Sequence, residues 1–381
     1  YACPSCRNPG TRRTFSPFPQ ASGSGLRFPK ILAIGSVLLL LGGCSDFGFY
    51  WQAASGHLDL LSRKQDIQEL IQNPGTDPEL SRKLKLVLEV REFAVSRLSL
   101  PEKAGYTGYV DLGRPYVTKI VRAAPKLKLE AYQWCYWFIG CQEYRGYFDA
   151  EEALRYAEGM DEDLDVSVRS VSAYSTLGWL NQPWVPDYFS DPVLSTFVKR
   201  KDADLAATLI HEMAHQVVYV KNDTSFNESF ATFVEEEGLE QFFQERIGRG
   251  SSEMIWYRSA RRDRERFRQL ALDAYEKLHH LYGSEMEDSE KLQNKKRIFN
   301  QLKQVFAEQE DQFEVLRYSQ WFSQELNNTH LLGIRRYHRD TEGFRRLFEK
   351  EGREWKNFFA RVLELADKPK DERKMLLNQE R

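Results

Sequence analysis

Apolar residues recur with helical spacing along most of the chain. Two such stretches, 58–71 and 79–98, are separated by Asn73-Pro74-Gly75, which favours a turn. The sequence therefore predicts a helical hairpin there. From about residue 105 to residue 180 aromatic, glycine and β-branched residues dominate, a texture typical of strands. The predicted strands are Tyr109–Leu112, Lys128–Tyr132 and Leu164–Val171, and a short helix is predicted at Ala150–Gly159.

From Asp202 onward nearly every segment has a helical pattern. The stretch 252–315 is so rich in charge that it indicates long, solvent-facing helices. Its basic cluster Arg258–Arg268, interrupted by Asp263 and Glu265, is more typical of a solvated helix than of a phosphate site. A helix pair, a small sheet and a helical C-terminal half together predict an α+β fold.

The first 43 residues have the layout of a targeting segment. Arg27 and Lys30 precede the apolar stretch 31–41, and Gly42-Gly43 then lead into Cys44. The ending Leu-Gly-Gly-Cys resembles the bacterial lipobox, in which the leader is cut before the cysteine and Cys44 is acylated. Ser45 after it favours sorting to the outer membrane, so we expect a lipid-anchored protein facing the periplasm. The alternative is an ordinary signal peptide or short anchor with Cys44 incidental.

The composition of the chain excludes several classes of protein. With 381 residues, 41% apolar and 29% charged, it can bury a sizeable core, and it is neither a disordered chain nor a small disulfide scaffold. The apolar stretch 31–41 is too short to span a bilayer, which excludes a polytopic membrane protein. A net charge of −2 argues against a nucleic-acid partner. Residues 1–26 fit neither signal nor domain; a zinc knuckle at Cys3 and Cys6 would lack a second ligand pair.

The chemistry is concentrated in His211-Glu212-Met213-Ala214-His215. This matches His-Glu-x-x-His, in which two imidazoles four residues apart share one helical face and bind zinc. A catalytic zinc needs a third protein ligand and one open position. The sequence therefore predicts one Zn²⁺ per chain, held by His211, His215 and a residue on a nearby element.

Glu228 is the expected third ligand. It follows His215 by thirteen residues, enough to leave the first helix, turn, and start a second one. The alternative is structural: Ser225 would cap the second helix, and Glu228 stands where a capping-box glutamate would. Glu235, Glu236 and Glu237 are more typical of a solvated charge run ending at Gly238 than of ligands.

Glu212 is the expected catalytic residue. One residue from His211, it can reach the water that zinc activates, accept its proton and pass it to the leaving amine. The alternative is a surface carboxylate without a catalytic role. An oxyanion also needs a donor. We choose Tyr337 from the candidates His330, Arg335, Tyr337 and His338.

Two further features precede the metal motif. The run Ala173, Tyr174, Ser175, Thr176, Leu177, Gly178 and Trp179 indicates an edge strand that would pair with extended substrate; a buried core strand is the alternative. Cys135 and Cys141 lie six residues apart, and acylation of Cys44 would leave these two. They either form a disulfide in an oxidising periplasm or stay as buried free thiols.

Taken together, the lipobox, GCQEYRGYFD, AYSTLGW, DADLAATLIHEMAHQVVYVKNDTSFNESFA and NNTHLLGIRRYH resemble the predicted aminopeptidase lipoproteins of proteobacteria over residues 30–365. The resemblance implies a zincin-like metallopeptidase with His211, His215 and Glu228 as ligands and Glu212 catalytic. The Gly-Ala-Met-Glu-Asn segment that binds the free amine in one major group of aminopeptidases is absent. Residues 159–162 are a poor substitute for it.

The sequence thus predicts five parts. They are an upstream extension (1–26), a lipoprotein signal (27–43), a helical segment (44–104), a zincin-like catalytic core (105–250) and a helical part packing on it (251–381). The expected function is that of a lipid-anchored zinc aminopeptidase with a peptide substrate. The alternatives are an envelope endopeptidase and a catalytically silent zinc-binding lipoprotein that binds a partner through its helices. Glu212 argues against the silent alternative, because a structural zinc site has no need of it.

Overall fold

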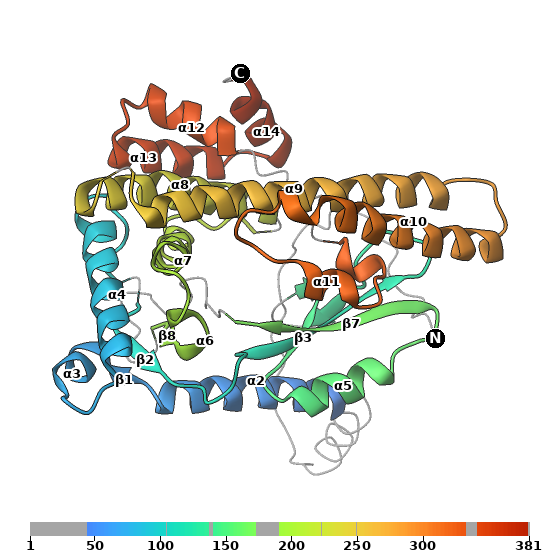
Figure 1. Cartoon of the computed structure of the whole chain (residues 1–381), viewed down its shortest axis with the longest axis horizontal. Coiled ribbons are helices and arrows are strands. Elements are labelled where there is room, and N and C mark those ends of the chain that lie inside the picture. Colours follow the sequence, from blue (N-terminus) through green and yellow to red (C-terminus); the bar gives the residue numbers. More distant parts are fainter. Residues whose placement is uncertain are drawn as a thin grey trace, which may run out of the picture. The chain divides into compact units, whose positions relative to one another are not determined.

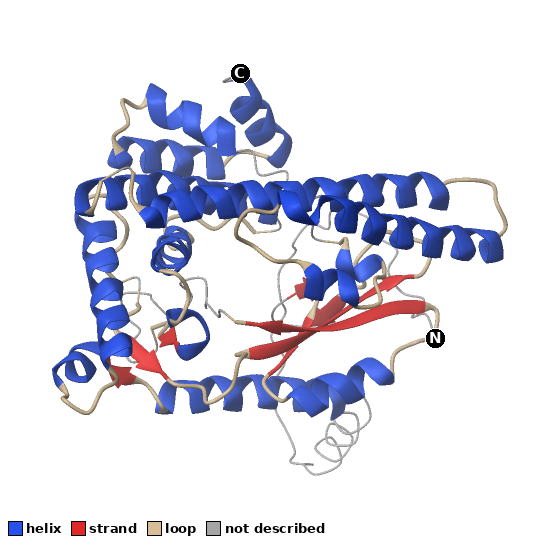
Figure 2. Ribbon diagram, in the orientation of Figure 1, coloured by secondary structure: helices blue, strands red, loops and turns tan. Residues whose placement is uncertain are grey.

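The computed structural model describes residues 44–103, 105–136, 140–172, 190–221, 223–248, 250–332 and 341–379. By their contacts, Tyr1–Gly48 and Phe49–Arg381 form two separate units, and the architecture below is that of the second. Figures 1 and 2 show its helices and strands. The predicted α+β class is confirmed. Among the described residues, no helix is both long and apolar enough to cross a membrane.

The elements follow one another in this order: α2 (Cys44–Ser62), β1 (Gln65–Asp66), α3 (Ile67–Gln72), α4 (Pro78–Ser96), β2 (Gly108–Val110), β3 (Thr118–Pro125), β4 (Trp134–Tyr136), β5 (Gly140–Gln142), β6 (Arg145–Tyr147), α5 (Ala150–Glu158), β7 (Leu164–Val171), β8 (Val193–Leu194), α6 (Ser195–Val198), α7 (Asp202–Ala214), α8 (Thr224–Arg246), α9 (Ser252–Tyr282), α10 (Asp288–Gln309), η2 (Glu310–Gln312), α11 (Ser319–Ser323), η3 (Asn328–His330), α12 (Thr341–Lys350), α13 (Trp355–Ala366) and α14 (Lys370–Gln379).

The predicted interruption between the first helices is confirmed. Asn73 ends α3, and α4 restarts at Pro78, whose preceding residue Asp77 accepts a hydrogen bond from the Leu80 N–H at 2.9 Å. An aspartate cap followed by proline at the first helical position is a strong helix start. The buried face of α4 packs against α7. The N-terminal helices therefore support the helix that carries the His-Glu-x-x-His motif.

A three-stranded antiparallel sheet has the order β6-β3-β7. Its outer strand β7 coincides with the predicted strand Leu164–Val171. The strand predicted at Lys128–Tyr132 is wrong, because that segment is a loop. The Asn328 side-chain amide donates to the backbone carbonyls of Pro125, Lys126 and Lys128 at 2.9 to 3.1 Å. Asn328 thus bonds the backbone carbonyls at the end of β3 and just after it, and the strand ends at Pro125.

The two faces of this sheet meet different elements. On one face Val121 and Ala123 pack with Ala153 of α5 in an apolar cluster. On the other face Asp165 forms a buried ion pair with Lys295 of α10, and the Thr329 hydroxyl of η3 donates to Ser167 Oγ at 2.6 Å. The second face is therefore polar where the helical half of the protein covers it.

The remaining strands form two small pairings. β1, β2 and β8 make a second three-stranded sheet, in which β2 and β8 run parallel. β4 and β5 form a hairpin whose opposite residues Cys135 and Cys141 are joined by a disulfide. The disulfide is one of the two alternatives that the sequence left open.

The largest hydrophobic core surrounds α7 and α8. It combines residues of α3 and α4, both central helices, and the C-terminal helices α12, α13 and α14. Figure 1 shows α12, α13 and α14 on the side of α8 opposite α7. Helix α8 is therefore packed on both sides, which immobilises the side chains that it directs at α7.

The long helices α9 and α10 expose less of their surface than predicted. Leu270, Ala274 and Leu278 of α9 form a second core with Phe299 and Phe306 of α10. These residues recur at helical spacing within a charged sequence, so one narrow apolar stripe faces inward. The prediction of solvent-facing helices holds only for their other sides.

Asp263 of α9 is fully buried and fixes the chain that follows η2. Its carboxylate accepts hydrogen bonds from the backbone N–H groups of Glu314, Val315 and Leu316 at 2.8 to 2.9 Å. Burial raises the pKa of Asp263, but these three bonds outweigh it and the net shift is downward. The ionised carboxylate thus stabilises the fold.

Replacing Asp263 by asparagine should lower the free energy of unfolding by about 2 to 3 kcal/mol at pH 7, because a neutral amide accepts these bonds poorly. The pKa of Asp263 is lower in the folded state than in the unfolded state. Its carboxylate therefore stabilises the fold fully above the unfolded-state pKa of about 3.9, and this stabilisation is lost as the pH falls through the folded-state pKa. Urea unfolding should therefore show that wild type and Asp263→Asn differ less in their free energy of unfolding at pH 3 than at pH 7. Asp273→Asn, at an exposed position of α9, is the matched control. An equal difference in the free energy of unfolding at pH 3 and pH 7 would contradict the role of the charge.

Candidate metal centre

Helix α7 carries His211, and His215 caps its C-terminal end. Its apolar residues Leu205, Leu209 and Ile210 are almost completely buried in the main core. At its start, Asp202 pairs with Arg82 and Lys83 of α4 at 2.7 and 2.6 Å. Hydrogen bonding to these cations, Arg82 first, overcomes burial and lowers the pKa of Asp202 to about 2. The helix is thus fixed at its first residue and along its apolar face.

A turn follows α7 and leads into α8. Asn227 stabilises this turn, because its side chain accepts from the Val220 N–H at 2.8 Å and donates to the Val220 carbonyl at 2.9 Å. The cap of α8 is Asp223, whose carboxylate accepts from the Phe226 N–H. The alternative in which Ser225 caps this helix is therefore wrong. A buried ion pair of Asp223 with Arg373 of α14, at 2.7 Å, favours the aspartate.

Helices α7 and α8 approach closely at Gly238. A Cβ placed there would lie 2.6 Å from Leu98 Cδ1 and 3.3 Å from Ile210 Cγ2. Only glycine leaves room for these buried side chains, so Gly238 allows the close contact of α8 with α7. This contact brings residues of α8 against the histidine side of α7.

The structure brings His211, His215 and Glu228 together. The two Nε2 atoms lie 3.2 Å apart. Glu228 Oε2 lies 3.5 Å from His211 Nε2, and Glu228 Oε1 lies 3.5 Å from His215 Nε2. Donors around a tetrahedral zinc with bonds of about 2.05 Å are separated by about 3.3 Å. The three donors, all within 4.8 Å of one another, therefore fit a single zinc ion. His215 is 4% exposed and Glu228 33%, so the carboxylate side is the side open to solvent.

Electrostatics within the site favour one bound cation. Burial lowers the pKa of His211, but hydrogen bonds to Glu228 and Glu235 outweigh it and raise the pKa to about 10. Burial, and then the charge of His211, lowers the pKa of His215 to about 4. The protein alone thus holds one positive charge among these donors. A metal ion that takes this place releases a proton.

Glu212 follows His211 on α7 and is half-buried. Its charge is one of those that raise the pKa of His211, which places the carboxylate within electrostatic range of the centre. A carboxylate at this position can exchange a proton with a molecule bound beside the three donors.

Comparison with known proteins gives the family of the chain. A family model described as "putative aminopeptidase" matches residues 48–377. The chain belongs to this family. Searches of curated proteins and of solved structures found no match. Membership in the aminopeptidase family supports peptidase activity at a coarse level, without identifying a metal or a substrate.

Sequence reasoning missed Glu235. Its Oε2 accepts a hydrogen bond from His211 Nδ1 at 2.9 Å, and its Oε1 accepts from the Tyr257 hydroxyl at 2.8 Å. A carboxylate bonded to Nδ1 leaves the Nε2 lone pair free for a metal and raises its basicity. The signal was available in the sequence, because Glu235 stands seven residues after Glu228 and therefore on the same face of α8.

His215 is held differently. Its Nδ1 is buried and has no hydrogen-bond partner among the described residues. Of the two imidazoles, His211 is therefore the one whose orientation is fixed by a carboxylate. Substitutions around His211 should affect the centre more strongly than those around His215 Nδ1.

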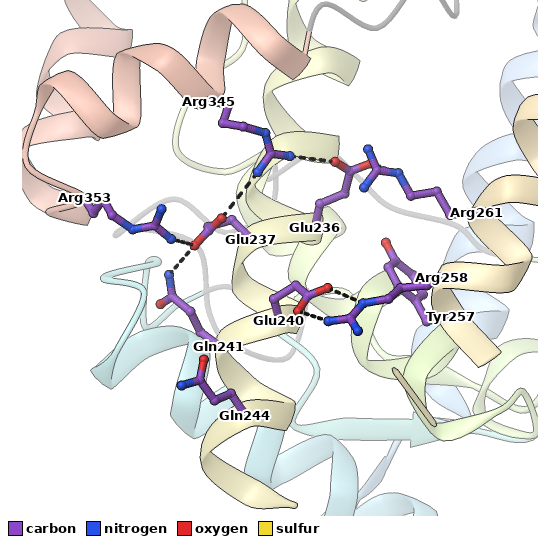
Figure 3. A pocket seen from close by; sticks show the side chains of 10 residues that line it. All are labelled: Glu236, Glu237, Glu240, Gln241, Gln244, Tyr257, Arg258, Arg261, Arg345 and Arg353. Carbon is purple, nitrogen blue, oxygen red and sulfur yellow. Dashed lines mark hydrogen bonds and ion pairs between the residues drawn. The ribbon is translucent and has the colours of Figure 1, made fainter. Parts of the chain in front are cut away.

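The predicted solvated run at Glu235–Glu237 is wrong. Glu236 and Glu237 are buried, and they line a cavity on α8 together with Arg261, Arg345 and Arg353, as Figure 3 shows. Arg261 contacts Glu236 at 3.0 Å, and Arg353 bonds Glu237. These charges compensate one another. Together with the pair of Arg345 and Glu237, the ion pairs join α8 to α9, to α12 and to the turn that follows α12. Of the basic residues of α9, Arg258 also pairs with α8 and Arg264 with Asp204 of α7, whereas Arg268 pairs with Glu265 of its own helix.

Several predicted site residues lie outside the described residues. These are Tyr337, Arg335 and His338, the substrate segment Ala173–Gly178 with Trp179, and the side chain of Cys44. His330 is described: it is buried in η3, and its Nδ1 accepts from the Asn327 N–H at 3.1 Å.

We predict that Glu235→Gln weakens zinc binding about 10- to 100-fold, because a neutral amide polarises His211 less and need not hold its tautomer. Tyr257→Phe should give a smaller loss in the same direction. Competition with a chromophoric chelator measures the affinity, and circular dichroism checks the fold.

Glu240→Gln is the matched control for Glu235→Gln. It lies on the same helix, but its carboxylate pairs with Arg258 at 2.6 Å and not with a histidine. If Glu240→Gln and Glu235→Gln weaken zinc binding equally, the role assigned to Glu235 is wrong.

Proposed function

We propose that this member of the aminopeptidase family is a zinc-dependent aminopeptidase. His211, His215 and Glu228 hold one zinc ion per chain, and Glu212 is the catalytic carboxylate. When bound, zinc supplies a Lewis acid that polarises the scissile carbonyl and lowers the pKa of water. The water can then lose a proton and attack the carbonyl.

The observation that carries this proposal is the cluster of three donors from two helices. Two imidazole nitrogens and one carboxylate, with edges of 3.2 to 3.5 Å, are the ligand set of a catalytic rather than a structural zinc site, because a fourth position stays open. Structural sites are more often built from four protein ligands, frequently cysteines. The family description supports peptide hydrolysis as the reaction.

Different residues of the chain have separate roles in the proposed reaction. Glu235 holds His211 in the tautomer that directs Nε2 into the site. The Glu212 carboxylate takes a proton from the attacking water and delivers it to the leaving amine nitrogen. We propose that Tyr337 donates to the developing oxyanion and that Ala173–Gly178, which follow the outer strand β7, pair with the extended substrate.

Replacing Glu212 by glutamine should lower kcat by about 10²- to 10⁴-fold and leave zinc binding intact, because the amide fills the same space but accepts no proton. Cleavage of a peptide library and metal content measured on the same preparation check both statements. Activity within a few-fold of wild type would remove Glu212 from the mechanism.

Matched peptides with free and acetylated N-termini test the aminopeptidase assignment. An aminopeptidase binds the substrate ammonium through a charge-assisted contact that acetylation removes. We expect release of N-terminal residues from the free peptides only. Equal cleavage of both, with cuts inside the chain, would instead indicate an endopeptidase.

We also propose that the protein is anchored in the outer membrane by acyl chains on Cys44 and faces the periplasm, where a disulfide such as Cys135–Cys141 forms. In cells that express the full chain, Cys44→Ser should abolish incorporation of a labelled fatty acid. The double variant Cys135→Ser with Cys141→Ser should keep the label. Labelling that persists in Cys44→Ser would contradict the anchor.

A further inference from the structure

Two arginines lie side by side on the polar face of the β6-β3-β7 sheet. In the antiparallel register Arg122 of β3 is opposite Ser167, and Arg169 of β7 is opposite Ile120. Residues two apart on a strand share a face, so Arg122 and Arg169 are diagonal neighbours, with Cβ atoms roughly 7 Å apart. Like charges at such positions repel each other.

No anion from the described part of the chain compensates this pair. Neither arginine forms an ion pair with a described carboxylate, and Arg169 Nη2 is buried without a hydrogen-bond partner. Elsewhere the arginines of this protein are commonly paired, as Arg258 is with Glu240 and Arg353 with Glu237. A half-buried guanidinium with an unmade hydrogen bond is costly, which makes this pair a candidate for binding an anion.

The surroundings add positive rather than negative groups. Burial, and then the charge of Arg122, lowers the pKa of Arg169 to about 10. Burial, followed by Arg169, Arg122 and Lys303 among other effects, lowers the pKa of His330 to about 4. The charged groups named for these two side chains are cations. Asp165 lies on the same face but is paired with Lys295, so the part of the face around Arg122 and Arg169 is suited to an anion.

The sheet that carries the two arginines is linked to the segments on both sides of the metal helix. Beyond the start of α7, Arg200 donates to the Ser172 hydroxyl, three residues after Arg169, at 2.6 Å. Beyond its end, Tyr219 lies within electrostatic range of Tyr144, which itself feels the charge of Arg122. An extended peptide advances about 3.3 Å per residue, so the length of peptide needed for the effect of the arginines measures their distance from the metal centre.

We propose that Arg122 and Arg169 form a subsite for a carboxylate of the peptide substrate, remote from the scissile bond. The inference rests on the proposed peptidase function and adds the class of substrate: acidic peptides or short peptides with a free C-terminus. Two guanidinium groups can hold one carboxylate through charge-assisted hydrogen bonds, and the bound anion removes the repulsion between them.

Binding of fluorescent peptides to zinc-loaded Glu212→Gln tests this subsite without turnover. One series compares free and amidated C-termini, and a second compares glutamate with glutamine within amidated peptides, which separates the two sources of the carboxylate. We expect one series to show a preference for the anionic peptide of about 10- to 100-fold in Kd. Adding Arg122→Gln or Arg169→Gln should reduce that preference to about twofold or less.

Lys119→Gln is the matched control, because it removes a positive charge from the same strand on the opposite face, where Lys119 Nζ donates to Ser170 Oγ. It should keep the preference. Equal binding of anionic and neutral peptides in both series, or a preference that survives Arg169→Gln, would overturn the subsite. If carboxylate-dependent binding is found while wild type cleaves no peptide, the subsite stands and the proposed function fails.

Thermal unfolding gives an independent readout. Because Arg169 repels Arg122 and has no anionic partner, Arg169→Met should unfold at the same temperature as wild type or higher. An anionic peptide that passes the binding test should raise the Tm of the Glu212→Gln protein and leave that of the same protein with Arg169→Met unchanged. A lower Tm for Arg169→Met would indicate a structural role for the arginine instead.

Discussion

The close contact between α7 and α8 is the constraint on which the candidate site depends. Gly238 leaves the space for Leu98 and Ile210, and Asn227 stabilises the turn that leads into α8. Without that approach His211 and His215 would have no carboxylate from α8 beside them. Helices α12, α13 and α14 then cover the other side of α8, so that Glu228 is presented from a helix packed on two sides.

Helix α8 performs different tasks on its different faces. Glu228 and Glu235, seven residues apart, face the histidines, one as a donor to the centre and the other as the acceptor that orients His211. Glu236 and Glu237 face a second set of arginines and join α8 to α9 and α12. Tyr257 links the two regions, because it lines the cavity and donates to Glu235. The ion pairs thus support the helix that positions the donors.

Features that depend on residues close together in the sequence could be predicted from their spacing. The histidines four residues apart, the break at Asn73-Pro74-Gly75 and the strand Leu164–Val171 could all be found from neighbouring residues. The errors came from partners distant in sequence. Three successive glutamates resemble a solvated run, yet Arg353, which bonds Glu237, lies 116 residues away. Lys128–Tyr132 has the composition of a strand, but Asn328 bonds the preceding backbone carbonyls from 200 residues away and more. The register that aligns Arg122 with Arg169 likewise exists only once the sheet is assembled.

The central claim is that His211, His215 and Glu228 form one zinc site. Titration of the metal-free protein with zinc against a competing chelator measures this directly. The account predicts one tight site per chain in wild type, and a loss of affinity on the order of 100-fold or more in Glu228→Ala, exceeding that expected for Glu235→Gln. Absence of a tight site in wild type, or an affinity in Glu228→Ala equal to that of wild type, would contradict it.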